Sequence, residues 1–194
     1  MTGEFLLRDA TADDAALRDA IADDRSLRDA CADDALCIGV LATQVFLDTY
    51  ATDGVRPVLA REALAHFSTA ETAALLARPD TRFIVAERNS HLLGFVQLTL
   101  GARQAEVEGS VTAEVVRLYV QRRFQGQRLG TRLLDRAAAL AAVHGATRLW
   151  LTAWVGNPRA IGFYAAQGWQ DVGSTDYVFE GETFLNRIFV RPLA

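Results

Sequence analysis

The segment Gln121–Gly130, QRRFQGQRLG, places two glycines directly before a strongly helical run, Thr131–Gly145. A glycine-bearing turn that enters a helix leaves backbone N–H groups unpaired and lies at the positive end of the helix dipole. Such a turn binds anions and suits a pyrophosphate. It contains neither the Gly-Lys-Ser/Thr of a nucleotide P-loop nor a full Gly-x-Gly-x-x-Gly fingerprint. By itself the turn is also typical of an ordinary strand–helix connection.

Two further segments, in a fixed order around this loop, strengthen the phosphate interpretation. Glu114–Val120, EVVRLYV, precedes the loop, and Asn157–Trp169, NPRAIGFYAAQGW, follows it. Together the three segments resemble the GNAT superfamily of acetyl-CoA-dependent N-acetyltransferases. The resemblance covers about residues 82–192. Within the family, WLTAWVGNPRAIGFY and FLDTY look closest to Pai-type polyamine acetyltransferases, which act on spermidine and spermine.

The resemblance implies an acetyl-CoA site on these segments. The family's pyrophosphate loop, Arg/Gln-x-x-Gly-x-Gly/Ala, aligns with Gln125–Gly130, and Arg128 stands where its central glycine is expected. The backbone of Leu118 and Val120 is expected to pair with the pantetheine arm. The residues implied in cofactor binding are Leu118, Tyr119, Val120, Gln125, Gly126, Gln127, Arg128, Leu129, Gly130, Thr131 and Asn157. Three arginines either reach the CoA phosphates or are merely solvated: Arg122, Arg123 and Arg132.

The same resemblance implies the catalytic groups. Tyr164 matches the tyrosine taken as general acid, because a phenol with a pKa near ~10 stays protonated at pH 7 and can donate to a departing thiolate. Asn157 either contacts the pantetheine or caps the helix that begins at Pro158. Glu114 is the candidate general base, four residues before Leu118 and expected on the same strand face. A water chain is the alternative base.

The implied reaction is transfer of the acetyl group of acetyl-CoA to a primary amine of a small molecule, by direct attack in a ternary complex. Polyamines are the first choice of acceptor. Trp154 either packs in the core or lines the acceptor channel. The alternatives are a protein or peptide N-acetyltransferase and a non-catalytic acyl-CoA-binding regulatory module. The acceptor, the general base and the oligomeric state, with a homodimer as one option, are left open.

An α/β domain must position these residues. The patterns predict the order β-α-α-β-β-β-α-β-α-β-β, a mixed sheet flanked by helices. The resemblance adds that the sheet is mostly antiparallel and that the acetyl-CoA cleft lies between splayed fourth and fifth strands. Strands are expected at residues 4–10, 82–87, 92–102, 113–120 and 147–155 and in a hairpin over 169–192; helices are expected up to Tyr50 and at 59–67, 69–78, 131–145 and 157–168.

A unit LRDA-x-ADD occurs three times at a period of ten within residues 7–36. Ten residues at about 100° each stop about 80° short of three helical turns, so equivalent residues do not stack on one face. The unit is also too short for a solenoid module. We expect the repeat to lengthen the first helix after a strand at Glu4–Ala10. The alternatives are a strand at Ser26–Ala30 preceded by an extra arm, a loop, and a partner-binding module.

Composition limits the remaining possibilities. The chain has 194 residues, of which 51% are hydrophobic and 23% charged, which suits a single domain over residues 1–194 with a substantial core. A net charge of −4 argues against a nucleic-acid partner and is compatible with a cationic substrate. Cys31 and Cys37 lack the spacing of a metal site or a disulfide framework. No leader and no apolar run near ~20 residues is evident, so we expect a soluble, cytoplasmic protein without metal or membrane partner.

Overall fold

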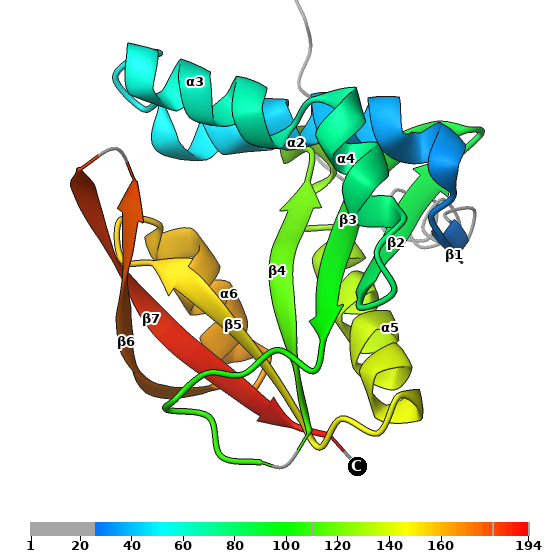
Figure 1. Cartoon of the computed structure of the whole chain (residues 1–194), viewed down its shortest axis with the longest axis vertical. Helices are drawn as coiled ribbons and strands as arrows, with labels where there is room; N and C mark the ends of the chain where they lie inside the picture. Colours follow the sequence, from blue (N-terminus) through cyan, green and yellow to red (C-terminus); the bar gives the residue numbers. More distant parts are fainter. Residues whose placement is uncertain (1–25, 110, 180, 194) are drawn as a thin grey trace, which may run out of the picture.

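The described residues form a seven-stranded sheet with the strand order β1-β2-β3-β4-β5-β7-β6 (Figure 1). The computed structural model describes residues 26–109, 111–179 and 181–193. Neighbouring strands are antiparallel, except that β4 and β5 are parallel. The strands are β1 Ser26–Asp29, β2 Thr81–Arg88, β3 His91–Leu100, β4 Thr112–Val120, β5 Arg148–Trp154, β6 Gln170–Phe179 and β7 Glu182–Pro192. The predicted mixed, mostly antiparallel sheet is confirmed.

Helices cover both faces of this sheet. Helix α5 (Leu129–Val143) packs on β2, β3 and β4, whereas α2 (Ala35–Tyr50) covers the opposite face together with α4 (Thr69–Leu76). Helix α3 (Pro57–His66) packs against α2, and α6 (Pro158–Ala166) packs against β5. The helices expected at 59–67, 69–78, 131–145 and 157–168 are therefore present, with ends that differ by at most two residues.

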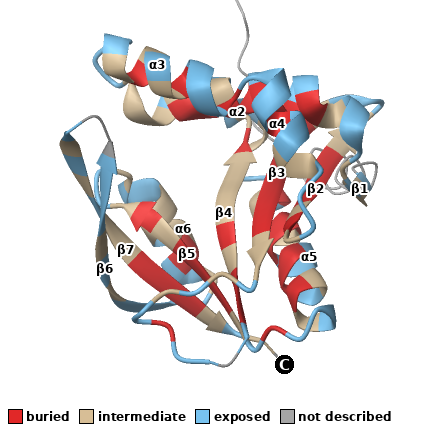
Figure 2. Ribbon diagram, viewed as in Figure 1, coloured by how far each residue is buried: buried red, intermediate tan, exposed pale blue. Residues whose placement is uncertain are grey.

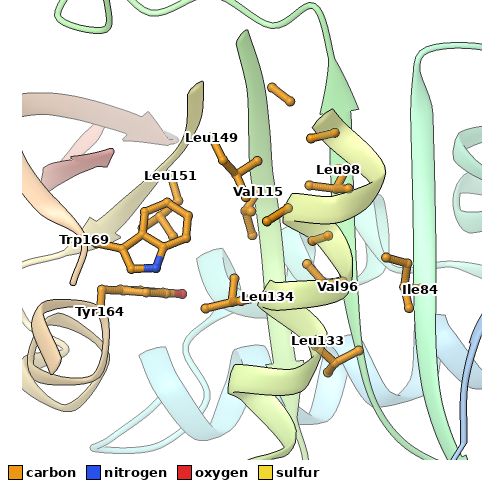
Figure 3. Close-up of a cluster of buried hydrophobic side chains, with 14 of the residues drawn as sticks. Ile84, Val96, Leu98, Val115, Leu133, Leu134, Leu149, Leu151, Tyr164 and Trp169 are labelled. Carbon is orange, nitrogen blue, oxygen red and sulfur yellow. The ribbon is translucent and has the colours of Figure 1, made fainter. Parts of the chain in front are cut away.

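The central strand β3 is buried on both faces, which explains its nearly continuous apolar run. Val96 and Leu98 belong to the core under α5, whereas Phe95 belongs to the core under α2. Figure 2 shows that burial is concentrated on the central strands and on the helix surfaces facing them. Figure 3 shows the first core, in which Leu133 and Leu134 of α5 lie against residues of the sheet. The core therefore packs β4 and the start of α5 against each other.

The third copy of the repeat, residues 27–34, forms a strand and a turn, so the expectation that it lengthens the first helix is wrong. Strand β1 pairs antiparallel with β2, and Leu27 packs against the main core. Of the two alternatives, the strand at Ser26–Ala30 is the one found beside β2. The strand expected at Glu4–Ala10 and the first two copies lie outside the described residues.

Polar contacts explain why helix α2 begins only at Ala35. Arg28 forms ion pairs with Asp34 at 2.7 Å and with Glu87 at 2.8 Å. The Asp34 carboxylate also accepts a hydrogen bond from the backbone N–H of Cys31 at 2.8 Å. The hydrogen bond from Arg28 lowers the pKa of Asp34 to about 2, so this carboxylate stays charged. Such local bonds give the backbone an alternative to helix.

The described part of the chain contains neither a cluster of metal-ligating side chains nor a helix suited to cross a membrane. No group of three or more His, Cys, Asp or Glu side chains could hold a metal ion there. Cys31 and Cys37 are both free and exposed. Within the same residues, none of the helices combines the length and apolar character that a membrane crossing requires.

Candidate active site

Strands β4 and β5 diverge after a short parallel pairing. Within the described residues, the pairing joins Thr112–Glu114 to Arg148–Trp150 and goes no further. Beyond it β4 continues alongside β3, and β5 continues alongside β7. The two strands separate there (Figure 1), and a cavity of about 460 Å³ opens between them. The cleft expected between the fourth and fifth strands is therefore present.

The edge of β4 presents backbone hydrogen-bonding groups to this cavity. The N–H of Gln121 donates to the carbonyl of Leu93 on β3 at 3.0 Å. Because backbone groups alternate sides along a strand, the N–H and C=O of Leu118 and Val120 point away from β3 and into the opening. Those of Tyr119 point toward β3. The two residues expected to pair with pantetheine thus have the required orientation.

A bulge determines which β4 side chains face α2. Strand β4 carries one extra residue, Val116, opposite β3. A bulge reverses the alternation of the side chains that follow it. Glu114 therefore shares its face with Arg117 and Tyr119, which lie toward the core under α2. The expectation that Glu114 shares a face with Leu118 is wrong, because that spacing assumed a regular strand.

The loop between β4 and α5 passes twice through left-handed backbone. Gly126 has a φ of 74° and Arg128 has a φ of 58°. Glycine adopts this conformation without strain, whereas for another residue it costs about 1–2 kcal/mol. Arg128 therefore holds a side chain in a backbone conformation that only glycine adopts without strain. This explains physically why the pyrophosphate-loop motif of the GNAT superfamily has a glycine at this position. The Arg128 side chain itself is exposed.

This loop brings the N-terminus of α5 beside the edge of β4. The first helical hydrogen bond runs from the N–H of Arg132 to the carbonyl of Arg128 at 3.0 Å. The N–H groups of residues 129–131 precede that bond and have no partner within the helix. At Gly130 a Cβ would lie 3.3 Å from the Phe163 ring, so glycine allows α5 and α6 to approach closely. The helix start therefore presents free N–H donors at the positive end of the helix dipole, which are the features that favour anion binding.

Gln125 connects the loop to β4. Its Nε2 donates to the carbonyl of Val120 at 2.9 Å. Its Oε1 is buried and has no hydrogen-bond partner among the described residues. A buried acceptor without a partner is unusual in folded proteins. Since Gln125 lines the cavity, this oxygen is positioned to accept a hydrogen bond from a bound molecule.

Helix α6 places Tyr164 at the cavity. Asn157 caps the helix by accepting a hydrogen bond from the N–H of Ala160 at 3.1 Å, and it also lines the cavity. Tyr164 is 8% exposed, and its ring centroid lies 5.9 Å from that of Trp169. Figure 3 shows the Tyr164 hydroxyl directed away from α6 toward Leu134. Burial raises the pKa of Tyr164 above its ordinary value, so the phenol remains a proton donor at neutral pH.

Glu114 lies half-buried at the point where β4 leaves β5. Burial raises the pKa of its carboxyl, and the nearby charge of Arg117 partly offsets that rise. Arg117 is held by a hydrogen bond to Gln97 Oε1 and lies 5.2 Å above the Phe67 ring. A carboxylate with a raised pKa accepts a proton more readily at neutral pH than an ordinary surface glutamate does.

The end of the cavity away from α5, which we call the acceptor end, is lined by aromatic rings of α2, β5 and β7. The Tyr50 ring centroid lies 4.9 Å from that of Phe46, 5.2 Å from Trp154 and 6.4 Å from Phe184. Trp154 was expected to line the acceptor channel or to pack in the core, and it lines the cavity. The other three rings were not identified from sequence. The i, i+4 spacing of Phe46 and Tyr50 marks one helix face, but nothing local indicates their proximity to Phe184.

The cavity brings together most of the residues singled out from the sequence. These are Glu114, Leu118, Tyr119, Val120, Gln125, Gly126, Gly130, Asn157 and Tyr164. The rest lie in the adjoining turn and first helical turn: Gln127, Arg128, Leu129 and Thr131. The Leu129 side chain is 1% exposed and belongs to the core, so only its backbone is available. Arg122 lines a neighbouring cavity of about 290 Å³ with Asp48. Sequence reasoning missed Glu62, Arg117 and Arg159, which also line the main cavity.

Known proteins share this sequence pattern and this fold. Over 98 residues the chain is 37% identical to a protein named IAA acetyltransferase from Azospirillum brasilense, a match that covers 50% of this chain and 60% of that relative. The chain thus spans less than two thirds of that relative's length. A solved structure of PaiA N-acetyltransferase from Thermoplasma acidophilum with coenzyme A has a TM-score of 0.66 at 20% identity, covering 87% of this chain and 98% of that one. The yncA structure from Salmonella typhimurium with acetyl-CoA has a TM-score of 0.60 at 20% identity, covering 88% and 95%.

The structural likenesses show the fold, and the family follows from the sequence. Residues 51–169 match the profile of the Acetyltransferase (GNAT) family. The matched region is more than half of the chain and runs from the end of α2 through the loop before α5 to Trp169, directly before β6. The protein therefore belongs to the GNAT family of acetyltransferases, for which acetyl-CoA is the acetyl donor.

Proposed function

We propose that the protein transfers the acetyl group of acetyl-CoA to a primary amine of a small molecule, by direct attack in a ternary complex. One observation carries this proposal. Glu114 on β4 and Tyr164 on α6 line the same cavity, beside the free edge of β4 and the start of α5. A proton acceptor and a proton donor thus border one space that also offers backbone donors.

The donor side of the cavity consists of the edge of β4, the loop and the start of α5. The N–H groups of residues 129–131 hold the pyrophosphate, because they combine free donors with the positive end of the helix dipole. The backbone of Leu118 hydrogen-bonds the pantetheine arm as an added strand would. The free Gln125 Oε1 accepts from an amide N–H of that arm.

The two side chains divide the proton transfers. Glu114 takes a proton from the acceptor ammonium, directly or through water, and so frees the nitrogen lone pair. The nitrogen attacks the thioester carbonyl and forms the C–N bond. The tetrahedral intermediate then collapses as the C–S bond breaks, and the nitrogen releases its second proton to water, which leaves a neutral amide. Tyr164 gives its proton to the departing sulfur and regains one from solvent. Holding amine and thioester together supplies a large part of the rate enhancement.

Contacts across the acceptor end favour a small acceptor over a peptide. Arg56, just before α3, forms a bidentate pair with Glu182 of β7, with both hydrogen bonds at 2.9 Å. The Tyr177 hydroxyl on β6 donates to Glu62 of α3 at 3.0 Å. These contacts join α3 to the β6–β7 hairpin beside the cavity. An extended polypeptide would have to break them to enter from this direction.

A thiol-release assay with acetyl-CoA and a panel of primary amines tests the proposal. We expect amine-dependent release of CoA and one acetylated amine per thiol, detected by mass spectrometry. Peptides with free N-termini should be poorer substrates than small amines. Tight CoA binding without turnover of any amine would instead support the non-catalytic module. Preferential acetylation of peptides would support the protein N-acetyltransferase alternative.

A further inference from the structure

The formal charges of the residues that line the main cavity sum to zero. Among the described residues the charged ones are Glu62, Glu114, Arg117 and Arg159, two carboxylates and two guanidinium groups. Burial also raises the pKa of Glu114, which makes that carboxyl easier to protonate than an ordinary surface glutamate. A polyamine carries several ammonium groups, each of which needs compensation when it leaves water. The carboxylates of the lining can compensate one ammonium group. Further ammonium groups of a polyamine would be repelled by the two arginines.

The aromatic rings of the acceptor end form a continuous surface. Trp154 and Phe184 stand edge to face, with centroids 6.0 Å apart, and Tyr50 contacts both. Burial raises the pKa of Tyr50, so its ring remains a neutral phenol at physiological pH. Aromatic rings bind other flat rings through offset and edge contacts. The surface is therefore complementary to an aromatic group.

Glu62 supplies the charge beside this surface. Its side chain is only 12% exposed and is fixed between the Tyr177 hydroxyl at 3.0 Å and His66 Nε2 at 3.4 Å. A carboxylate fixed in the same cavity lining as the rings attracts a single ammonium group without needing to reorganise. Glu114 also lines the cavity, so the amine finds one carboxylate that attracts its ammonium group and another that accepts its proton.

We infer that the acceptor is an arylalkylamine: a primary amine joined by a short chain to one aromatic ring. The ring packs against Tyr50, Trp154 and Phe184, and the amine reaches toward Glu114. The cavity of about 460 Å³ must also admit the thioester end of acetyl-CoA, which limits the acceptor to about one ring system. This inference rests on the proposed acetyltransferase function and specifies its substrate class.

Steady-state kinetics with saturating acetyl-CoA test the substrate class on the unmodified protein. Phenethylamine and tryptamine are compared with hexylamine, putrescine and spermidine. We expect kcat/KM for the two aromatic amines to exceed that for each aliphatic amine by about tenfold or more, since one extra well-packed apolar group is worth roughly 10- to 200-fold. Spermidine matching or exceeding phenethylamine would overturn the inference and leave the proposed function intact. Failure of every amine, with acetyl-CoA still bound, would instead contradict the proposed function.

Two variants localise the preference. Trp154→Leu and Phe184→Leu each remove one ring from the acceptor end, and each should lower kcat/KM for phenethylamine roughly 3- to 10-fold while hexylamine changes much less. Phe83→Leu is the matched control, because that ring is buried in the core under α2 and does not line the cavity. Equal losses for both amines in the two acceptor-end variants would contradict the assigned ring site. If a variant folds poorly, the ratio of the two substrates within the same preparation still reports the preference.

Discussion

The two ends of the active-site cavity are built by different means. The donor side consists mainly of backbone from one continuous stretch, residues 114–132, in which a strand edge, a loop and a helix start follow one another. The acceptor end consists of side chains from α2, α3, β5 and β7, which are distant in sequence. A backbone site tolerates many side chains so long as its dihedral angles are kept, whereas a side-chain site changes with each substitution. One chain can thus retain the family's donor while its acceptor diverges.

Removal of the Tyr164 hydroxyl should have the largest effect. General acid catalysis contributes about 10²–10⁴-fold, so Tyr164→Phe should lower kcat by roughly 10²- to 10³-fold. Because the donor side is mainly backbone, the affinity for acetyl-CoA should change by less than about threefold. Calorimetric titration with acetyl-CoA beside the kinetic assay separates the two effects. Full activity across the pH range would refute the role assigned to Tyr164.

Neutralising Glu114 should have the next largest effect. A general base acts only when deprotonated, so kcat should fall as the pH drops through the raised pKa of Glu114. Glu114→Gln should lower kcat by about 10- to 100-fold, and the decrease of kcat at low pH should disappear. Glu108→Gln is the control, because Glu108 is exposed and does not line the cavity. An unchanged pH profile in Glu114→Gln would assign the proton transfer to water.

Opening the acceptor end should have a smaller effect that depends on substrate size. Arg56→Ala removes the pair with Glu182 and loosens the contact between α3 and the β6–β7 hairpin. Bulky amines should then enter more easily, whereas phenethylamine already fits. Because an exposed ion pair stabilises the contact only weakly, the rise in kcat/KM for bulky amines should be modest, about 2- to 5-fold, and kcat/KM for phenethylamine should stay unchanged. Arg78→Ala breaks the exposed pair with Asp80 elsewhere and should leave both substrates unaffected. An equal change for every amine would show that the contact does not restrict access.

Relieving the strain at Arg128 should change stability more than activity. Arg128→Gly removes the left-handed penalty and should raise the free energy of unfolding by about 1 kcal/mol and Tm by about 2–4 °C. Arg128→Ala keeps a Cβ in the same backbone conformation and separates loss of the side chain from relief of strain. Thermal melting measures both variants. A lower Tm for the glycine variant than for the alanine variant would contradict the claim that the backbone at Arg128 is strained.

Deletion of residues 7–24, which hold the first two repeat units, should have the smallest effect. Strand β1 and every residue assigned to the cavity lie after them. Acetyl transfer by the shortened chain should stay within about twofold of the full chain. A shortened chain that folds, by circular dichroism, but no longer binds acetyl-CoA would show that these units contribute to the site.

The contrast between the donor side and the acceptor end also explains which features could be predicted from the sequence. The strand, loop and helix start of the donor side could be located from the sequence, because turn glycines, strand periodicity and a helix start are local signals; their role in binding acetyl-CoA stays a prediction. The position of Glu114 relative to Leu118 was wrong because a bulge depends on pairing with β3. The third repeat copy was assigned to a helix because its composition is helical, while pairing with β2 and the Arg28–Asp34 contact decided its fold. The acceptor-end rings were missed because only the tertiary fold brings Tyr50 near Phe184.

Initial-velocity kinetics test the central claim most directly. Acetyl-CoA is varied at several fixed concentrations of phenethylamine, and released thiol and N-acetylated product are both measured. Direct attack in a ternary complex predicts double-reciprocal lines that intersect, with one acetylated amine per CoA and no acetyl group on the protein by intact-mass analysis. Parallel lines accompanied by an acetylated protein intermediate would contradict the account.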